Sequence, residues 1–185
     1  VIQVAAGAMH TCAIVNTSTD DIRLYCFGNR DSGRLGNGLV TGASPLPVPV
    51  VTTGLALPAG AWSEVRAGGS HSGAVFIGDE EWKIGWGSLE ALGELSGEAT
   101  SSVASLLGEG APRALALGGA HTCNLNNLGT TLRCGGSNSH GQSGVEPTGQ
   151  GVFVERADIL FAPMGDEPTF EDVAAGARHT CFIHA

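Results

Sequence analysis

A short motif that recurs four times constrains this chain more than any other feature of its sequence. The motif is a glycine, two variable residues, a histidine, a serine or threonine, and then a mostly apolar run. Its glycine and histidine positions are Gly7 and His10, Gly68 and His71, Gly118 and His121, and Gly176 and His179. Self-similarity at a period of tens of residues is typical of repeat architectures. The motif therefore predicts repeat units over about 1–61, 62–112 and 113–169, with an incomplete unit at 170–185.

Short stretches with strand character surround each copy of the motif. They are 1–6, 12–15 and 22–27 in the first unit, 65–68, 74–77 and 83–86 in the second, 114–117, 123–126 and 131–134 in the third, and 170–173 with the start of a second strand in the fourth. Polar turn residues separate them, and the run 16–21 is predicted to be a hairpin loop. The 29 glycines and the 15% content of charged residues agree with a protein of strands and turns.

A more variable stretch follows the third strand of each unit and can supply a fourth strand. In the first unit this stretch is 44–51, where three prolines predict an exposed edge strand or a polyproline-like connection. In the second unit, 98–107 is predicted to be a helical turn or a loop. Four-stranded sheets repeated radially are the blades of a β-propeller, and a blade needs neighbours on both faces. The fold class is therefore all-β, and about three and a half blades belong to a larger ring.

A glycine-rich loop after the third strand adds a second signature. It runs from Phe27 to Gly36 in the first unit, and 134–144 aligns on 26–36 without a gap. In the second unit the loop differs and is interpreted as carrying one extra residue before Gly93. Together the two signatures resemble the repeat of the regulator-of-chromosome-condensation family. The resemblance implies a propeller, commonly of seven blades, and it implies that the motif histidines hold the blade backbone rather than act in catalysis.

The five cysteines occupy two repeated positions. Cys12 and Cys26 lie on the second and third strands of the first unit, and Cys123 and Cys134 take the same places in the third unit. The second unit has glycine at both places. Because both cysteines are lost together, we favour Cys12–Cys26 and Cys123–Cys134 disulfides, and we expect Cys181 to pair with a partner outside the chain. Free buried thiols and a zinc site remain the alternatives.

The disulfides predict an oxidising compartment, hence an extracellular or cell-surface protein. Asn16 begins the only Asn-x-Ser/Thr sequon, Asn16-Thr17-Ser18, and is a candidate glycosylation site. The net charge of −9 and the single lysine argue against nucleic-acid binding. No apolar stretch is long enough for a membrane-spanning segment.

No arrangement of residues in the sequence indicates catalysis, a cofactor or a metal. His140 and His184 lie outside the repeated motif and have no recognisable catalytic neighbour. The acidic clusters 79–81 and 166–167 lack the spaced oxygen ligands of a calcium loop and are interpreted as solvated turns.

We therefore expect a non-enzymatic module that binds protein or glycan partners or forms part of an extracellular structure. Further copies, or the remainder of its own chain, would supply the missing blades. The loops 29–36 and 138–144 are the candidate contact surfaces. The alternative hypothesis is an intracellular regulator, such as a small-GTPase exchange factor or a ligase-associated scaffold.

Overall fold

The computed structural model describes residues 1–18, 21–79, 81–93, 100–109, 112–147, 153–159 and 169–184, and these ranges form antiparallel sheets with one turn of 3-10 helix. The first sheet contains β1 (Gln3–Ala6), β2 (His10–Ser18), β3 (Asp21–Asn29) and β4 (Ala43–Pro49). The second contains β5 (Ala61–Ala67), β6 (His71–Ile77), β7 (Glu81–Ser88) and β8 (Thr100–Glu109). The third contains β9 (Pro112–Leu117), β10 (His121–Asn126), β11 (Leu132–Ser137) and β12 (Phe153–Ile159), and the fourth contains β13 (Phe170–Ala175) and β14 (Thr180–His184).

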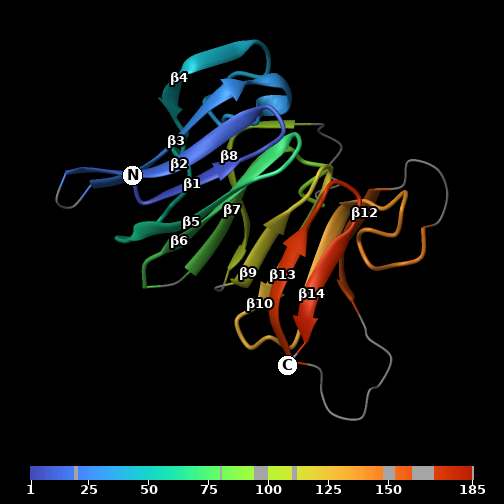
Figure 1. The fold of residues 1–185 in the computed structure, drawn as a ribbon. Helices are drawn as coiled ribbons and strands as arrows, with labels where there is room; N and C mark the ends of the chain where they lie inside the picture. Colours follow the sequence, from blue (N-terminus) through green and yellow to red (C-terminus); the bar gives the residue numbers. More distant parts are fainter. Residues whose placement is uncertain are drawn as a thin grey trace.

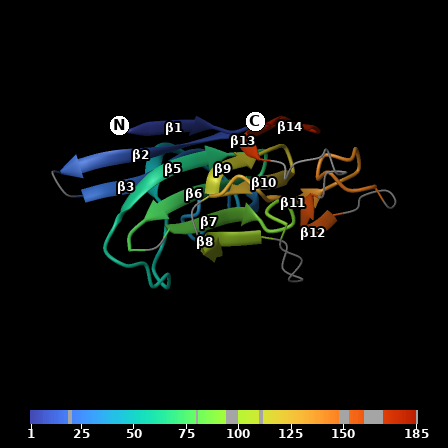
Figure 2. The same cartoon turned by 90° about the horizontal axis from the view of Figure 1, so that it is seen from below.

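Each four-stranded sheet is a meander in which neighbours in sequence are neighbours in space. The first sheet packs face to face on the second, and the second packs on the third, so that the three sheets succeed one another along an arc (Figures 1 and 2). The two-stranded fourth sheet packs on β9 and β10 at the far end of this arc. The predicted all-β fold of four-stranded antiparallel sheets is confirmed.

The fourth strand of the first sheet is the proline-containing stretch. Within the described residues β4 pairs with β3 alone, with Pro49 opposite Tyr25 and Val48 opposite Cys26. Proline cannot donate to a strand ladder, so it is tolerated where one side of the strand has no partner. The prediction of an edge strand is confirmed.

Two local predictions were wrong. The stretch predicted as a helical turn or loop is a strand in its described part, because β8 pairs along β7 with Leu106 opposite Ile84; residues 98 and 99 lie outside the described residues. The first hairpin loop is also shorter than predicted. Pairing between β2 and β3 continues through Asn16 opposite Ile22 to Ser18 opposite Asp21.

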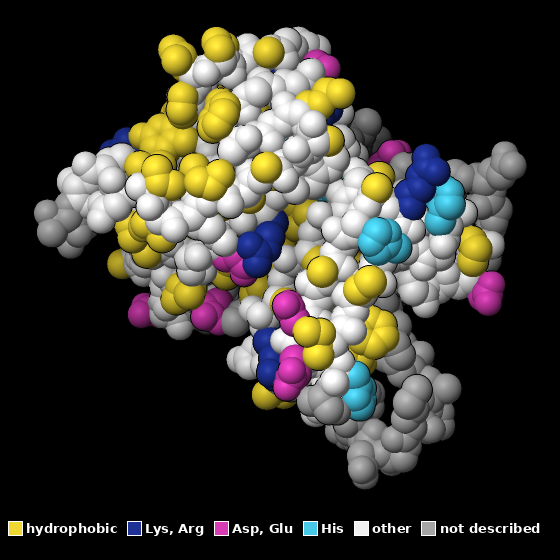
Figure 3. All heavy atoms as spheres, viewed as in Figure 1, with side chains coloured by type: hydrophobic (Ala, Val, Ile, Leu, Met, Phe, Trp, Pro, Cys, Tyr) yellow, Lys and Arg dark blue, Asp and Glu magenta, His cyan; other side chains and the backbone are white. Residues whose placement is uncertain are grey.

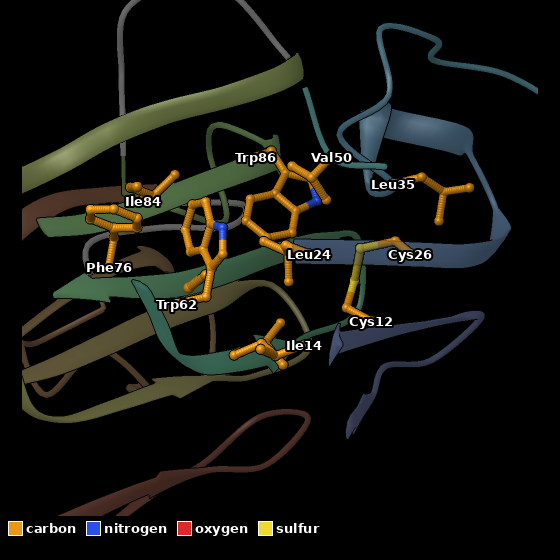
Figure 4. Close-up of a cluster of buried hydrophobic side chains, with 12 residues drawn as sticks. Cys12, Ile14, Leu24, Cys26, Leu35, Val50, Trp62, Phe76, Ile84 and Trp86 are labelled. Atoms are coloured by element: carbon orange, nitrogen blue, oxygen red, sulfur yellow. A yellow bond between two sulfur atoms is a disulfide. The ribbon is translucent and has the colours of Figure 1, made fainter. Parts of the chain in front are cut away.

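The core lies between the sheets because the strands alternate their side chains between two faces. From the first sheet, Cys12, Ile14 and Leu24 point toward the second sheet. There they meet Val65, Trp62 and other apolar residues of β5–β7 (Figure 4). Trp62 and Phe76 stack edge to face with ring centroids 5.2 Å apart. Each sheet thus depends on its neighbour for burial.

Candidate functional site

The four Gly-x-x-His segments form tight turns that start the second strand of each sheet. In the first turn the Gly7 amide donates to the His10 carbonyl at 2.8 Å, and the histidine ring folds back over the glycine. A Cβ on Gly7 would lie 2.5 Å from His10 Cε1, which is too close for any side chain. The same contact recurs at Gly68, Gly118 and Gly176. The glycine is therefore required by the close approach of the ring and, at Gly7, Gly68 and Gly118, by the glycine carbonyl of the next turn.

Backbone hydrogen bonds connect each turn to the next. The Ala8 amide donates to the Gly68 carbonyl at 3.1 Å, and the Gly69 amide donates to the Gly118 carbonyl at 3.0 Å. The Gly119 amide donates to the Gly176 carbonyl at 3.2 Å. One such bond thus joins each pair of neighbouring sheets at the same position.

Two of the histidines also bridge to the following sheet. His10 Nε2 lies 2.7 Å from Ser72 Oγ, and His121 Nε2 lies 2.8 Å from Thr180 Oγ1. The Ser72 hydroxyl donates its proton to the Arg34 carbonyl at 3.0 Å, so His10 Nε2 must donate to the hydroxyl oxygen. This fixes the neutral Nε2–H tautomer of His10.

Burial keeps these histidines neutral. It lowers the pKa of His10 to about 4 and that of His71 to about 3, with a smaller contribution from nearby positive charges. Burial also lowers the pKa of His121. Three histidines are thus enclosed between sheets, where a substrate has no access.

The remaining histidines lie at the surface. His179 of the fourth unit is exposed, in contrast to its three buried equivalents. His140 and His184 are exposed as well, and the His140 Nδ1 lies 2.9 Å from the Ser139 hydroxyl.

The glycine-rich loops are mostly buried or half-buried, although they were expected to supply contacts to partners. Arg34 Nε donates to the Asp31 carbonyl and Arg34 Nη1 to the Gly69 carbonyl of the next sheet. Arg34, Leu35, Gln142 and Ser143 are all buried. A few loop residues, including Asp31, Ser139 and His140, have exposed side chains that a partner could contact.

The loop of the second unit is two residues shorter than that of the first, and the expected extra residue before Gly93 is wrong. The Thr122 hydroxyl donates to the Ala91 carbonyl, as the Ser72 hydroxyl donates to the Arg34 carbonyl. Ala91, Leu92 and Gly93 therefore correspond to 34–36. The buried Leu92 takes the place of Leu35, and this equivalence of packing is visible only in three dimensions.

Disulfides join the two cysteine pairs. Cys12 is directly opposite Cys26 on β2 and β3, and Cys123 is directly opposite Cys134 on β10 and β11. Both pairs have a Cα–Cα distance of 4.1 Å, and all four residues are fully buried. Cys181 is a free, exposed thiol.

Sequence reasoning missed what replaces the disulfide in the second unit. There Gly73 lies opposite Gly85, and a Cβ on Gly73 would lie 3.4 Å from Leu115 Cδ2 and 3.5 Å from Leu117 Cδ1. The leucines of the third sheet fill the space that a disulfide fills elsewhere. Where a disulfide is present, the same positions of the facing sheet are the smaller pairs Val65 with Ala67 and Val173 with Ala175.

The remaining sequence features to place are the acidic clusters, the sequon at Asn16 and any membrane-spanning segment. No group of three or more His, Cys, Asp and Glu side chains is placed to bind a metal within the described residues. Glu80, Asp166 and Glu167 lie outside those residues. Asn16 is exposed near the end of β2, and its glycosylation stays a prediction. The part of the chain that the structure describes contains no helix of the length and hydropathy needed to cross a membrane.

A large apolar groove covers the outer face of the first sheet. It has a volume of about 420 Å³ and is lined by side chains of β1–β4 and the chain start, namely Val1, Val4, Thr11, Ala13, Val15, Thr17, Tyr25, Phe27 and Pro47. Hydrophobic side chains are spread over this part of the surface in Figure 3.

No protein-family model matches the sequence, and no curated protein matches it either. Several solved structures do match. Prp20p from Saccharomyces cerevisiae aligns over 99% of this chain with a TM-score of 0.75 and 18% sequence identity. Human WBSCR16 aligns over 100% of this chain with a TM-score of 0.70 and 20% identity. The chain covers 44% of the length of each of these two proteins.

The CRINKLY WD40 ectodomain of the Arabidopsis thaliana receptor kinase ACR4 is a third match. Its TM-score is 0.50 at 19% identity, over 98% of this chain and 51% of that chain. From these likenesses, the sheets of the present chain form part of a β-propeller. The repeat fold of the present chain is of the type found in yeast RCC1, which is Prp20.

Proposed function

We propose that this chain is part of a non-catalytic, protein-binding propeller that works outside the cell. The extracellular location is supported by the two buried disulfides at equivalent places in the first and third sheets. Disulfides at repeated positions persist in oxidising environments and are rare in the cytosol. The exposed sequon at Asn16 agrees with a secretory route.

The absence of catalysis is supported by the way the recurring histidines are used. A general base must reach the proton that it removes. His10, His71 and His121 are instead buried between sheets. Their lowered pKa values keep them neutral near pH 7, and they are sequestered from solvent.

Protein binding is supported by the neighbours of this fold. The work on Prp20p describes its binding to Gsp1p and histones, and another structure holds yeast RCC1 bound to Kap60. In the present chain, Leu39 and Val40 on the connection between β3 and β4 are exposed and offer apolar contact area.

Non-reducing peptide mapping of the native protein by mass spectrometry, with glycan detection, tests this proposal. We expect linked peptides for Cys12–Cys26 and Cys123–Cys134 and a glycan on Asn16. Five thiols that all react with an alkylating reagent, together with an unmodified Asn16, would overturn the extracellular assignment.

An intracellular exchange factor is the second candidate, and the likeness to Prp20p favours it. Its test is the release of labelled GDP from Gsp1p, with Prp20p as the positive control. On our proposal the chain does not accelerate release. Acceleration by the chain, lost when exposed loop residues such as Asp31 are replaced, would put the exchange factor in first place.

A further inference from the structure

The last strand of the first sheet carries a proline at every second residue. Pro45, Pro47 and Pro49 lie on β4, whose described neighbour is β3 and whose other side forms the outer rim of the sheet (Figure 1). We propose that these three prolines close the rim to strand addition, so that a strand of another chain does not extend the sheet at β4. This inference does not depend on the proposed function.

The register of β3 and β4 gives the direction of the backbone groups at the end of β4. The Val50 amide donates to the Leu24 carbonyl at 3.0 Å, so Val50 turns its backbone groups toward β3. Hydrogen-bonded and non-hydrogen-bonded pairs alternate along an antiparallel ladder. Pro49, opposite Tyr25, therefore turns its backbone groups away from β3. An arriving strand would meet a ring nitrogen that has no hydrogen to donate.

Pro45 and Pro47 lie in a bulge of the same strand. Ser44 and Val48 pair with β3, and the three residues between them face one residue of that strand. The Ser44 hydroxyl donates to the Leu46 carbonyl at 2.8 Å and so satisfies an acceptor within the bulge. A bulge bends an edge strand and interrupts the ladder that an arriving strand needs. The two prolines remove two amide donors from the same place.

Prolines have this role at β4 because the surrounding sequence contains no charge. No Asp, Glu, Lys or Arg occurs from 35 to 63. Edge strands are commonly protected by charged side chains, by proline or by bulges, and β4 has only the last two of these. Without its prolines, β4 would be an uncharged strand containing leucine and valine, and such strands pair readily with other chains.

The rim is a different surface from the faces through which the sheets pack. Neighbouring sheets along the arc meet through their faces, as β2 does with β5. The blades of a propeller are arranged radially in the same way, so a further blade beside the first sheet leaves the outer edge of β4 uncovered. Leu46, on this rim, has 71% of its surface exposed. The edge therefore needs protection of its own.

The test replaces the three prolines together by threonine. The triple variant Pro45→Thr, Pro47→Thr, Pro49→Thr restores three amide hydrogens with a residue that favours strands. Two copies of one edge pair antiparallel about a two-fold axis, so we expect a dimer. In sedimentation velocity at about 100 μM, where a contact with a Kd near 1 μM is saturated, the variant should have at least twice the mass of the wild-type chain.

The matched control restores the same amide hydrogens and adds charge. The triple variant Pro45→Lys, Pro47→Lys, Pro49→Lys should sediment as the wild-type chain does, because lysines on an edge repel a second copy. Urea unfolding establishes that each variant is folded. If the threonine triple variant unfolds, the double variant Pro45→Thr, Pro47→Thr gives the same comparison.

Two results would overturn the proposal. One is a folded threonine variant that sediments as the wild-type chain does, since the prolines would then not be what keeps the rim unpaired. The other is association of the lysine variant to the same extent as the threonine variant, since that contact would not be strand addition at β4. All three chains share every other surface, so a difference between them reports on this edge alone.

Discussion

The buried histidines predict that the fold loses stability in mild acid. His71 is fully buried with a pKa of about 3, and His10 has a pKa of about 4, against 6.5 for an exposed histidine. Between these values the unfolded chain binds protons that the folded chain does not. The folded state is therefore fully favoured above pH 6.5, and it loses stability as the pH falls toward the folded pKa values.

The size of the loss follows from the pKa differences. One pKa unit is worth about 1.4 kcal/mol, so at pH 5 each of the two histidines costs about 2 kcal/mol relative to pH 7. The sum of about 4 kcal/mol is a large fraction of the 5–15 kcal/mol typical of a folded domain. Burial raises the pKa of Glu64, which acts in the opposite direction at lower pH.

Urea unfolding followed by tryptophan fluorescence at pH 7, 6 and 5 measures this loss. His71→Gln removes one titrating group and should recover about 2 kcal/mol of the difference between pH 7 and pH 5. His140→Gln, at an exposed position, should leave the difference unchanged. If His71→Gln unfolds, His10→Gln gives the same comparison. An unfolding free energy that is flat between pH 7 and pH 5, or equal pH slopes in all variants, would refute the reasoning.

Three further predictions concern stability and are checked by the same urea titration. Replacing both Cys12 and Cys26 by alanine should lower the unfolding free energy by up to about 3 kcal/mol. Dithiothreitol should then lower the unfolding free energy of the variant less than that of the wild type. Equal stability of variant and wild type would contradict the entropic argument. Gly28→Ala should lower the unfolding free energy by at least ~2 kcal/mol more than Gly38→Ala. Both glycines have positive φ, but only at Gly28 would a Cβ lie 2.6 Å from a carbonyl oxygen, that of Met9. Similar losses for the two variants would show that the loop relaxes. Trp86→Phe should cost about 1–2 kcal/mol through loss of the Nε1–H bond to the Arg34 carbonyl at 2.9 Å, and an unchanged midpoint would mean that this bond adds nothing.

The architecture within each sheet could be predicted because its signals are local. The spacing of glycine and histidine marks each turn, and the alternation of side chains marks each strand. The joint absence of cysteines at Gly73 and Gly85 indicated that the two places are neighbours, and the structure places these residues opposite each other. Partners on adjacent strands of a hairpin can be inferred from their distance to the turn.

Local signals failed where pairing outweighs propensity. The sequence of β8 contains good helix formers, yet it forms an edge strand because β7 offers it a ladder of hydrogen bonds. The prediction of an extra residue before Gly93 in the second loop was wrong because residue type alone does not show which glycines of two loops correspond. The burial of Leu92 and the acceptor role of the Ala91 carbonyl correct that alignment.

The sequence by itself determined the repeat and the first three strands of each complete unit, and it favoured the pairing of cysteines, because each of these depends on residues within one unit. Only the tertiary structure decided what happens between units. It showed that His10 bonds to Ser72 and that Leu115 and Leu117 replace a disulfide. These contacts join residues about one repeat apart, and no local period specifies how the side chains of two sheets meet. Packing of complementary volumes between sheets is what fixes them.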